Sequence, residues 1–289
     1  MATLRLVRER KIAELISQPR GGTVLEASGV LAMGHDCLVI FDNLKRVARI
    51  DRGLDPGSPR HAWLGRTRPG EGYEDIAYSP YTKRFYLLIE AEKHSDGTFK
   101  AIIEECDRQF QFKERHWVDI AFERRNTGLE GLTSIRWEGR DYLLALCEGN
   151  KCRGGKKSHK PGGGRIHVLQ RKGRLWVSVA RIKLPRHVKF RDYSGVTLRG
   201  NRIAVISQQT SRLWLGVLRP GDWTIEGRGR QYDLPRTKKG NLLYCTVEGI
   251  AWVSADTFVM VSDLKKHILP KRCGKKDQSI HVFRLPVGR

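Results

Sequence analysis

Five short segments of the chain place a Ser or Glu at the same point of a shared pattern. In each segment this residue has small or acidic neighbours and is followed by a branched apolar residue and a short β-like run. The five positions are separated by 46, 56, 64 and 54 residues, and they are Ser28, Glu74, Glu130, Ser194 and Glu248. Converging carboxylates and hydroxyls would offer the oxygen ligands that hard cations prefer. Whether they converge depends on the elements that carry them.

Other ionisable groups recur around these positions. Glu26 precedes Ser28 by two residues and Asp192 precedes Ser194 by two, and side chains two apart on a strand point the same way. We therefore expect Glu26 and Asp192 to support the ligands through hydrogen bonds or water. Three carboxylates near the end of a second apolar run are candidate general bases and two loop histidines are candidate acids, namely Asp42, Glu148, Asp263, His159 and His267.

The elements that carry these residues form an internal repeat. Each unit continues with a polar turn, a second apolar run and further short runs rich in Val, Ile, Leu and Trp, and no long stretch has helical periodicity. The pattern predicts one all-β domain over residues 1–289, a single β-propeller with five blades at 24–66, 74–122, 130–186, 194–236 and 248–289. The fifth unit lacks an outer strand, and we expect residues 4–15 to supply it and close the ring.

In a propeller the first strand of each blade lines the central channel, so the five recurring residues would meet near the axis. Three converging carboxylates cannot all remain ionised without a counter-charge. The oxygen-only set favours Ca²⁺, with Mg²⁺ or Mn²⁺ as alternatives. A channel that is merely polar and holds no metal is the simpler alternative.

Basic residues are expected to ring the mouth of this channel. The loops that follow the second strand of each blade are rich in Lys and Arg, and those of blades three and five are also long and each contain one Cys and one central His. Such loops can hold phosphate oxygens through side chains and backbone N–H groups, or can simply be solvated. The candidate substrate-binding residues are Lys45, Arg46, Lys151, Arg153, Lys156, Lys157, Arg212, Lys265, Lys266 and Arg272.

The composition agrees with a polyanionic partner. The net charge is +23, from 54 Lys and Arg against 31 Asp and Glu. No apolar run is long enough to span a membrane, and the charged N-terminus has no signal-like apolar core. We expect a cytoplasmic monomer with six reduced cysteines, although Cys147 and Cys152 are close enough in sequence to bridge a loop.

The order Ser, Glu, Glu, Ser, Glu at the five positions resembles the calcium-activated nucleotidase (apyrase) family, five-bladed propellers with a calcium ion in the channel. The segment "FDNLKR", with Asp42, Asn43, Lys45 and Arg46, stands where that family has an acidic-basic turn. "CEGN" and "EGL" also look like the phytase-like esterase propellers. These resemblances imply calcium and a phosphate ester as substrate.

Three functions are compatible with the sequence. The first is a metal-dependent hydrolase acting on a phosphoanhydride or phosphoester, such as a nucleotide. The second is a non-catalytic propeller that binds nucleic acid or another polyanion through its basic face, with a structural metal. The third is a calcium-dependent esterase or lactonase. No Walker A, Gly-x-Ser-x-Gly, HExxH or dinucleotide motif is present.

Overall fold

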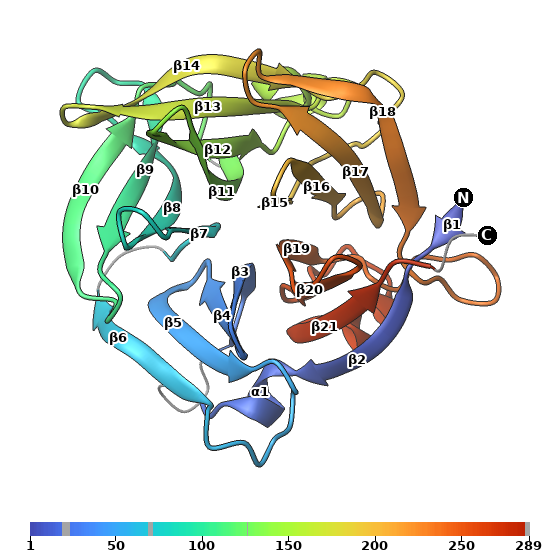
Figure 1. Cartoon of the computed structure of the whole chain (residues 1–289). Coiled ribbons are helices and arrows are strands. Elements are labelled where there is room, and N and C mark those ends of the chain that lie inside the picture. The colour runs from blue at the N-terminus through green and yellow to red at the C-terminus, as the bar shows by residue number, and fades with distance from the viewer. Residues whose placement is uncertain (19–23, 69–71, 126, 287–289) are drawn as a thin grey trace.

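The computed structural model describes residues 1–289 except 19–23, 69–71, 126 and 287–289. Its strands radiate around a central axis as a β-propeller, which confirms the predicted fold class (Figure 1). Only one short α-helix, α1 (Ile12–Leu15), lies in the described part of the chain, and it occupies the end of the predicted 4–15 strand. No helix in these residues is long and apolar enough to cross a membrane.

The described strands form antiparallel units of four, with the first strand of each unit innermost (Figure 1). The first two units are β3 (Ala27–Met33), β4 (Asp36–Phe41), β5 (Leu44–Asp51) and β6 (Ala62–Arg68), then β7 (Ile76–Ser79), β8 (Arg84–Lys93), β9 (Phe99–Cys106) and β10 (Phe112–Val118). The third contains β11 (Leu129–Trp137), β12 (Arg140–Cys147), β13 (Arg165–Lys172) and β14 (Leu175–Lys183). The fourth contains β15 (Gly195–Arg199), β16 (Arg202–Ser207), β17 (Arg212–Arg219) and β18 (Thr224–Asp233), and the last has β19 (Val247–Trp252), β20 (Thr257–Ser262) and β21 (Ser279–Arg284).

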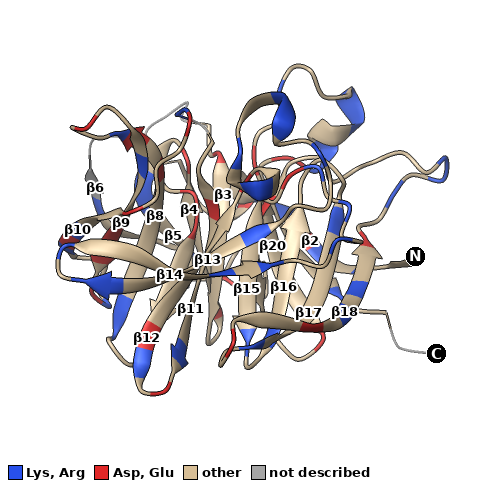
Figure 2. Cartoon of the chain, turned by 90° about the horizontal axis from the view of Figure 1, so that it is seen from above, with Lys and Arg blue, Asp and Glu red and all other residues tan. Residues whose placement is uncertain are grey.

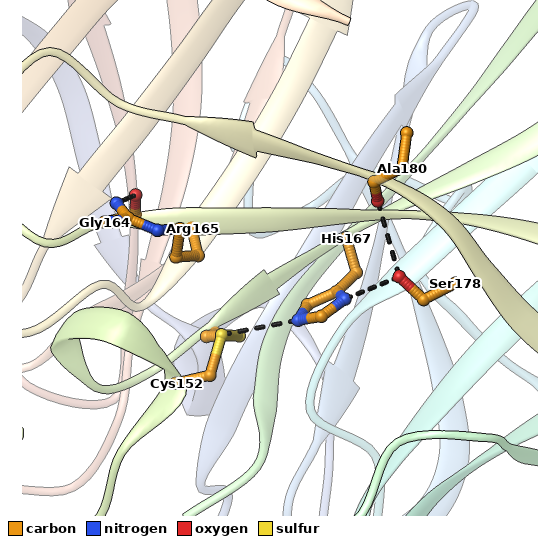
Figure 3. The surroundings of a disulfide bond; sticks show 7 residues. Cys152, Gly164, Arg165, His167, Ser178 and Ala180 are labelled. Carbon is orange, nitrogen blue, oxygen red and sulfur yellow. Dashed lines mark hydrogen bonds between the residues drawn. A yellow bond between two sulfur atoms is a disulfide. The ribbon is translucent and has the colours of Figure 1, made fainter.

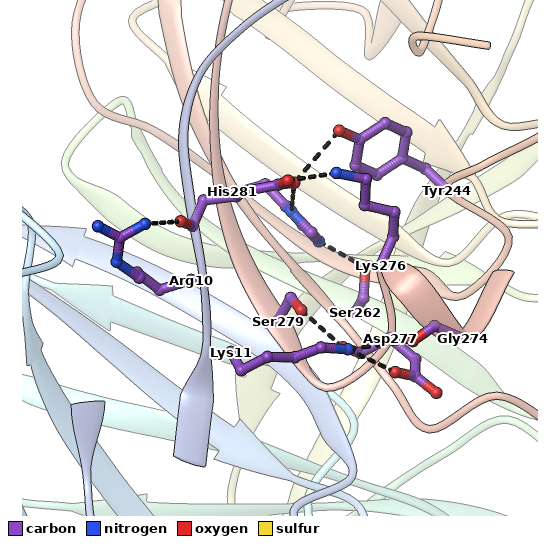
Figure 4. Close-up of polar contacts among 10 residues, drawn as sticks. Arg10, Lys11, Tyr244, Ser262, Gly274, Lys276, Asp277, Ser279 and His281 are labelled. Carbon is purple, nitrogen blue, oxygen red and sulfur yellow. Dashed lines mark hydrogen bonds and ion pairs between the residues drawn. The ribbon is translucent and has the colours of Figure 1, made fainter. Parts of the chain in front are cut away.

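The N-terminal strand completes the last unit, as predicted. β2 (Arg5–Lys11) pairs antiparallel with β21, and β1 (Ala2–Thr3) adds a short parallel pairing to β18. Polar contacts around Lys276, Asp277 and His281 fasten this closure, because Lys11 Nζ lies 2.7 Å from Asp277 Oδ1 (Figure 4). Glu9 on β2 pairs with Lys276 and lies 3.3 Å from His281 Nδ1.

The inner strands approach one another closely, which explains the Gly that follows the Ser or Glu in four of the five segments. A Cβ at Gly195 would lie 2.4 Å from the carbonyl oxygen of Glu248, and one at Gly249 would lie 2.7 Å from the Cα of Gly29. At these points no side chain fits between neighbouring blades. Blade two has Asp75 instead, whose carboxylate accepts the backbone N–H groups of Leu132 and Ile76 and so points away from the channel.

Apolar faces of adjacent blades pack together and form the core. Trp214, for example, is fully buried between blades three and four with Ile182 and Val196. Burial of such faces supplies most of the folding free energy, and it fixes the angle at which each inner strand meets the axis.

Four cysteines are paired in disulfides, so the expectation of six reduced thiols is wrong. Cys147 at the end of β12 is bonded to Cys152, and Cys245 is bonded to Cys273 (Cys152 appears in Figure 3). Cys37 and Cys106 are buried and take part in neither disulfide. Disulfides of this kind persist mainly in oxidising compartments, so the thiols no longer support a cytoplasmic location.

Candidate metal centre in the channel

The three predicted inner glutamates converge on one cavity. Glu74, Glu130 and Glu248 stand at the start of the innermost strands of their blades and line a channel cavity of about 180 Å³. They come from three different blades, so the repeat brings together residues more than fifty positions apart in sequence. The propeller therefore collects the carboxylates as the sequence pattern predicted.

The two serines at the equivalent positions support neighbouring blades. Ser28 donates a hydrogen bond to the carbonyl of Tyr73, and Ser194 donates one to the carbonyl of Val247 at 2.9 Å. Each acceptor immediately precedes the recurring Glu of another blade, Glu74 or Glu248. Since each hydroxyl gives its proton to a carbonyl, its lone pairs remain available to a cation. Ser194 also lines the cavity.

Besides the inner ring of Glu74, Glu130 and Glu248, a second ring of polar residues lines the cavity. These residues directly follow the second strand of their blade or lie within it, and they are Asp42, Glu90, Glu148, Gln208 and Asp263. The sequence analysis singled out Asp42, Glu148 and Asp263, which line this cavity, but not Glu90 and Gln208, which line it too. The missed signal is an apolar or small residue followed by an acid or amide at the end of the second run, in "FD", "IE", "CE", "SQ" and "SD".

Burial and mutual repulsion raise the pKa of every carboxylate in both rings. Burial is the larger cause for Glu74, Glu130 and Glu248, whose pKa values lie well above the usual range, and neighbouring carboxylates raise them further. In the second ring, burial and then nearby acids raise the pKa of Asp42 to about 8 and that of Glu148 to about 7. Carboxylates crowded in this way favour a bound cation or shared protons between them.

One cation, Lys266, reaches this cavity. Partial burial opposes its charge, but Glu248, Asp263 and other carboxylates raise its pKa, so it stays protonated. A single ammonium cannot balance the acids around it. Gln208 relieves part of the repulsion by donating a hydrogen bond from Nε2 to Glu248 Oε1 at 2.6 Å.

The predicted supporting acids lie beside the rings. Asp192 lines the cavity and accepts hydrogen bonds from Ser207 and from the backbone of Gln209, so it is held in place. Glu26, Asp42 and Asp263 bring carboxylate oxygens within 4.8 Å of one another. Asp42 Oδ1 is buried and has no hydrogen-bond partner.

This arrangement fits a hard divalent cation. The donors are carboxylate, hydroxyl and amide oxygens, and no His or Cys is among the residues that line the cavity. Ca²⁺ takes six to eight such oxygens with flexible geometry, and waters complete the shell. The buried oxygen of Asp42, which has no hydrogen-bond partner, is a further donor that such a cation could use.

The structure places the predicted substrate-binding residues in different environments. Lys45 is not at the channel, because it is buried and its Nζ lies 3.0 Å from Glu104 Oε1. Arg46 lies over the ring of Trp63, and Arg212 donates to Asp233 at 2.8 Å. The remaining candidates lie on the two long loops, and they are Lys151, Arg153, Lys156, Lys157, Lys265, Lys266 and Arg272.

The long basic loops of blades three and five project from one face of the molecule. Figure 2 shows Lys and Arg on their short helical turns. Each loop is bound to its surroundings by a disulfide, through Cys152 or Cys273. Their histidines, His159 and His267, are exposed and do not line the cavity.

No protein-family model and no curated protein sequence matches this chain. Among solved structures, glutaminyl cyclase from Myxococcus xanthus is 13% identical with a TM-score of 0.57, over 99% of this chain and 98% of that one. The RRP9 WD40 repeats are 11% identical with a TM-score of 0.49, over 98% of this chain and 100% of that one. A PQQ-bound aldose sugar dehydrogenase from Streptomyces coelicolor is 12% identical with a TM-score of 0.48, over 98% of each chain. At these identities the similarity to the cyclase shows the fold alone, and the resemblance to apyrases stays a prediction.

Proposed function

We propose that the channel binds a divalent cation, with calcium favoured by the donors, and that the protein is a hydrolase of a phosphate-bearing anion at the channel mouth. The observation that carries this proposal is that eight carboxylates, the seven of the two rings and Asp192, line a single cavity with one lysine. A structural polar channel has no need of so many acids at so high a cost in repulsion.

Different residues of the cavity would bind the metal, stabilise negative charge and transfer a proton in such a hydrolase. Glu74, Glu130 and Glu248 would hold the ion, and the bound ion would supply Lewis-acid polarisation of a phosphoryl oxygen. Lys266 offers a protonated ammonium at the same cavity to stabilise negative charge. Glu90 and Glu148 both have a pKa of about 7, raised by burial, so either can accept a proton from an attacking water near neutral pH.

The metal is tested first by thermal unfolding in buffer freed of divalent cations, with calcium, magnesium or manganese then added. A ligand that binds only the folded state raises the midpoint by mass action. We expect calcium to raise the midpoint of the wild type and to have little effect on Glu130→Gln. The matched control is Glu123→Gln, which removes one exposed carboxylate outside the channel and should respond like the wild type.

The apo proteins give a second readout. Because Glu130 is repelled by its neighbours, Glu130→Gln without metal should unfold at the same or a higher temperature than the wild type. Lower stability of that variant both with and without calcium would mean that Glu130 only supports the fold. No response of the wild type to any metal would refute the site.

Turnover is tested separately, with the metal that stabilises the protein. Release of inorganic phosphate from nucleoside di- and triphosphates and from simple phosphomonoesters should be lost in Glu148→Gln if that residue transfers the proton. Metal binding without release of phosphate would favour the polyanion-binding propeller, and cleavage of carboxylic esters or lactones would favour the esterase.

A further inference from the structure

A second hollow lies on blade three, outside the channel. It has a volume of about 380 Å³ and is formed by both ends of the β12–β13 loop, the start of β13, the end of β14 and the segment after it. We call this hollow the blade-three basic pocket, because six of its ten lining residues are cations and none is acidic. The six cations are Lys151, Lys160, Arg165, Lys183, Arg186 and Lys189.

These cations have no counter-charge in the described part of the chain. Some basic residues elsewhere on the molecule are paired with acids, such as Arg171 with Glu105 and Arg60 with Asp36. In the pocket, the guanidinium of Arg165 makes its hydrogen bond to the carbonyl of Gly164 at 2.7 Å, and no carboxylate is among the lining residues (Figure 3). Like charges held together in this way repel one another unless an anion lies between them.

The strand register places two of these cations directly opposite each other. Arg165 on β13 is paired directly with Lys183 on β14, and like charges at directly opposed positions destabilise an antiparallel sheet. Burial and the nearby cations Arg181 and Arg186 lower the pKa of Arg165, which is the response of a cation crowded by others. An arrangement that costs stability in the free protein is expected where a ligand later compensates for it.

The floor of the pocket is rigid. The buried side chain of Asn150 accepts the N–H of Gly163 at 2.7 Å and the hydroxyl of Tyr193 at 3.0 Å, and its Nδ2 donates to the carbonyl of Ser158 at 2.8 Å. The backbone N–H of Lys151 donates to the carbonyl of Gly163 at 2.7 Å. The cations therefore project from a fixed base, which reduces the ordering cost of binding.

Glycine keeps the wall of the pocket open. Gly162 has a φ of +89°, and a Cβ there would lie 2.8 Å from the carbonyl oxygen of Arg186. The bare backbone lets the loop approach the Arg186 segment, so cations from both sides face the same space.

We propose that the blade-three basic pocket binds a small anion that carries at least two phosphate groups. Six cations in a space of this size suit a diphosphate or triphosphate moiety better than one phosphate, since each phosphate is typically held by two or more donors. No aromatic residue is among the lining residues, so the pocket lacks the stacking surface that single-stranded nucleic acid uses.

This pocket is separate from the channel but shares a wall with it. Tyr193 lines the channel cavity, and its hydroxyl donates to the same Asn150 oxygen that holds Gly163 of the pocket. The inference does not depend on a cation in the channel or on turnover, because the unpaired cations and their register exist in either case.

The test is calorimetric titration with inorganic tripolyphosphate, pyrophosphate and orthophosphate. The buffer is freed of divalent cations on a chelating resin, because soluble chelators are themselves polyanions. We expect one saturable site whose affinity falls from tripolyphosphate to orthophosphate. The double variant Lys183→Gln, Arg186→Gln should bind tripolyphosphate at least about tenfold more weakly, as expected for the loss of two charge-assisted contacts.

The matched control is Lys238→Gln, Lys239→Gln, which removes the same charge from an exposed loop of the same face and should bind within about twofold of the wild type. The pocket variant should also unfold at the same or a higher temperature, because it relieves the Arg165–Lys183 opposition. Equal weakening in both double variants would overturn the proposal in favour of a diffuse basic field. Absence of saturation would also overturn it, as would tighter binding of an oligonucleotide than of tripolyphosphate.

Discussion

At the scale of single residues, the channel acids have higher pKa values in the folded protein than in the unfolded chain. Burial, followed in importance by neighbouring charges, raises the pKa of Asp42 to about 8, and burial and then Glu148 raise that of Glu90 to about 7. The ordinary pKa values of Asp and Glu, which apply to the unfolded chain, are 3.8 and 4.5, so between about pH 4 and pH 8 the folded protein binds more protons than the unfolded chain. Without metal, stability therefore falls as pH rises through this window.

This pH dependence gives a prediction for the metal-free protein. The thermal midpoint should fall between about pH 6.5 and pH 8, and saturating calcium should remove most of that fall because the ion replaces the released protons. Burial lowers the pKa of His281, so its contribution has the opposite sign, and this contribution fades as pH rises above the ordinary histidine value of 6.5. Thermal scans at several pH values, with and without calcium, measure the effect.

The variant Asp42→Asn provides the check on this prediction. It removes the second-ring carboxylate whose pKa is highest, at about 8, so the metal-free midpoint should depend less on pH above about pH 7. A wild-type midpoint that is flat over this range without metal would show that the channel acids do not titrate as described.

At the scale of elements, two disulfides hold the loops that carry most of the mouth cations. Cys147 and Cys152 are separated by five residues, whereas Cys245 and Cys273 are separated by 28. The second link joins the segment before β19 to η3 (Lys271–Lys275) in the loop that carries Lys266. It therefore fixes the position of the one lysine that reaches the channel cavity.

Loop length predicts how much each disulfide stabilises the fold. In the chain-entropy model, removal of the Cys245–Cys273 link should cost about 3.5 kcal/mol and removal of the Cys147–Cys152 link about 2 kcal/mol. Urea unfolding of the double variants Cys245→Ala, Cys273→Ala and Cys147→Ala, Cys152→Ala measures these losses. Equal or reversed losses would contradict the loop-length argument.

Thiol counting tests the pairing itself. Protein prepared under oxidising conditions and denatured without reductant should expose two reactive thiols, those of Cys37 and Cys106. Six reactive thiols would show that the pairs do not form.

At the scale of the whole molecule, the sequence predicts what depends on the repeat and misses what depends on contacts between blades. The convergence of Glu74, Glu130 and Glu248 follows from their equal place in each unit. Glu90 was missed because β8 continues past it to Lys93, so Glu90 lies within a strand, whereas Asp42, Glu148 and Asp263 directly follow theirs. The burial of Lys45 could not be predicted, because Glu104 comes from another blade and carries no local signal.

The same limit applies to the basic pocket and the serine contacts. Lys183, Arg186 and Lys189 each read as ordinary solvated residues, and only the register of β13 against β14 opposes one of them to Arg165. The hydrogen bond from Ser28 to the carbonyl of Tyr73 likewise needs the spacing between blades. Of the two disulfides, only Cys147–Cys152 was considered from the sequence, on its short spacing, whereas 28 residues separate Cys245 from Cys273 and leave no local signal.

Ring closure decides whether the blades unfold together. β2 supplies the outer strand of the last unit, and Glu9 joins Lys276, His281 and Tyr244 there. Without residues 1–11, β21 would be an open edge that can pair with other chains. We therefore expect the shortened chain to lose cooperative unfolding and to aggregate.

A chain that lacks only residues 1–3 is the matched control, because it loses the two-residue pairing of β1 with β18 but retains the pairing of β2 with β21. It should unfold within a few degrees of the wild type. A synthetic peptide of residues 1–11, added during refolding of the shortened chain, should restore the cooperative transition by adding the missing strand. If the chain without residues 1–11 instead unfolds in one transition at the wild-type temperature, closure by β2 does not hold the propeller together, and the blades must draw their cooperativity from the buried faces between them.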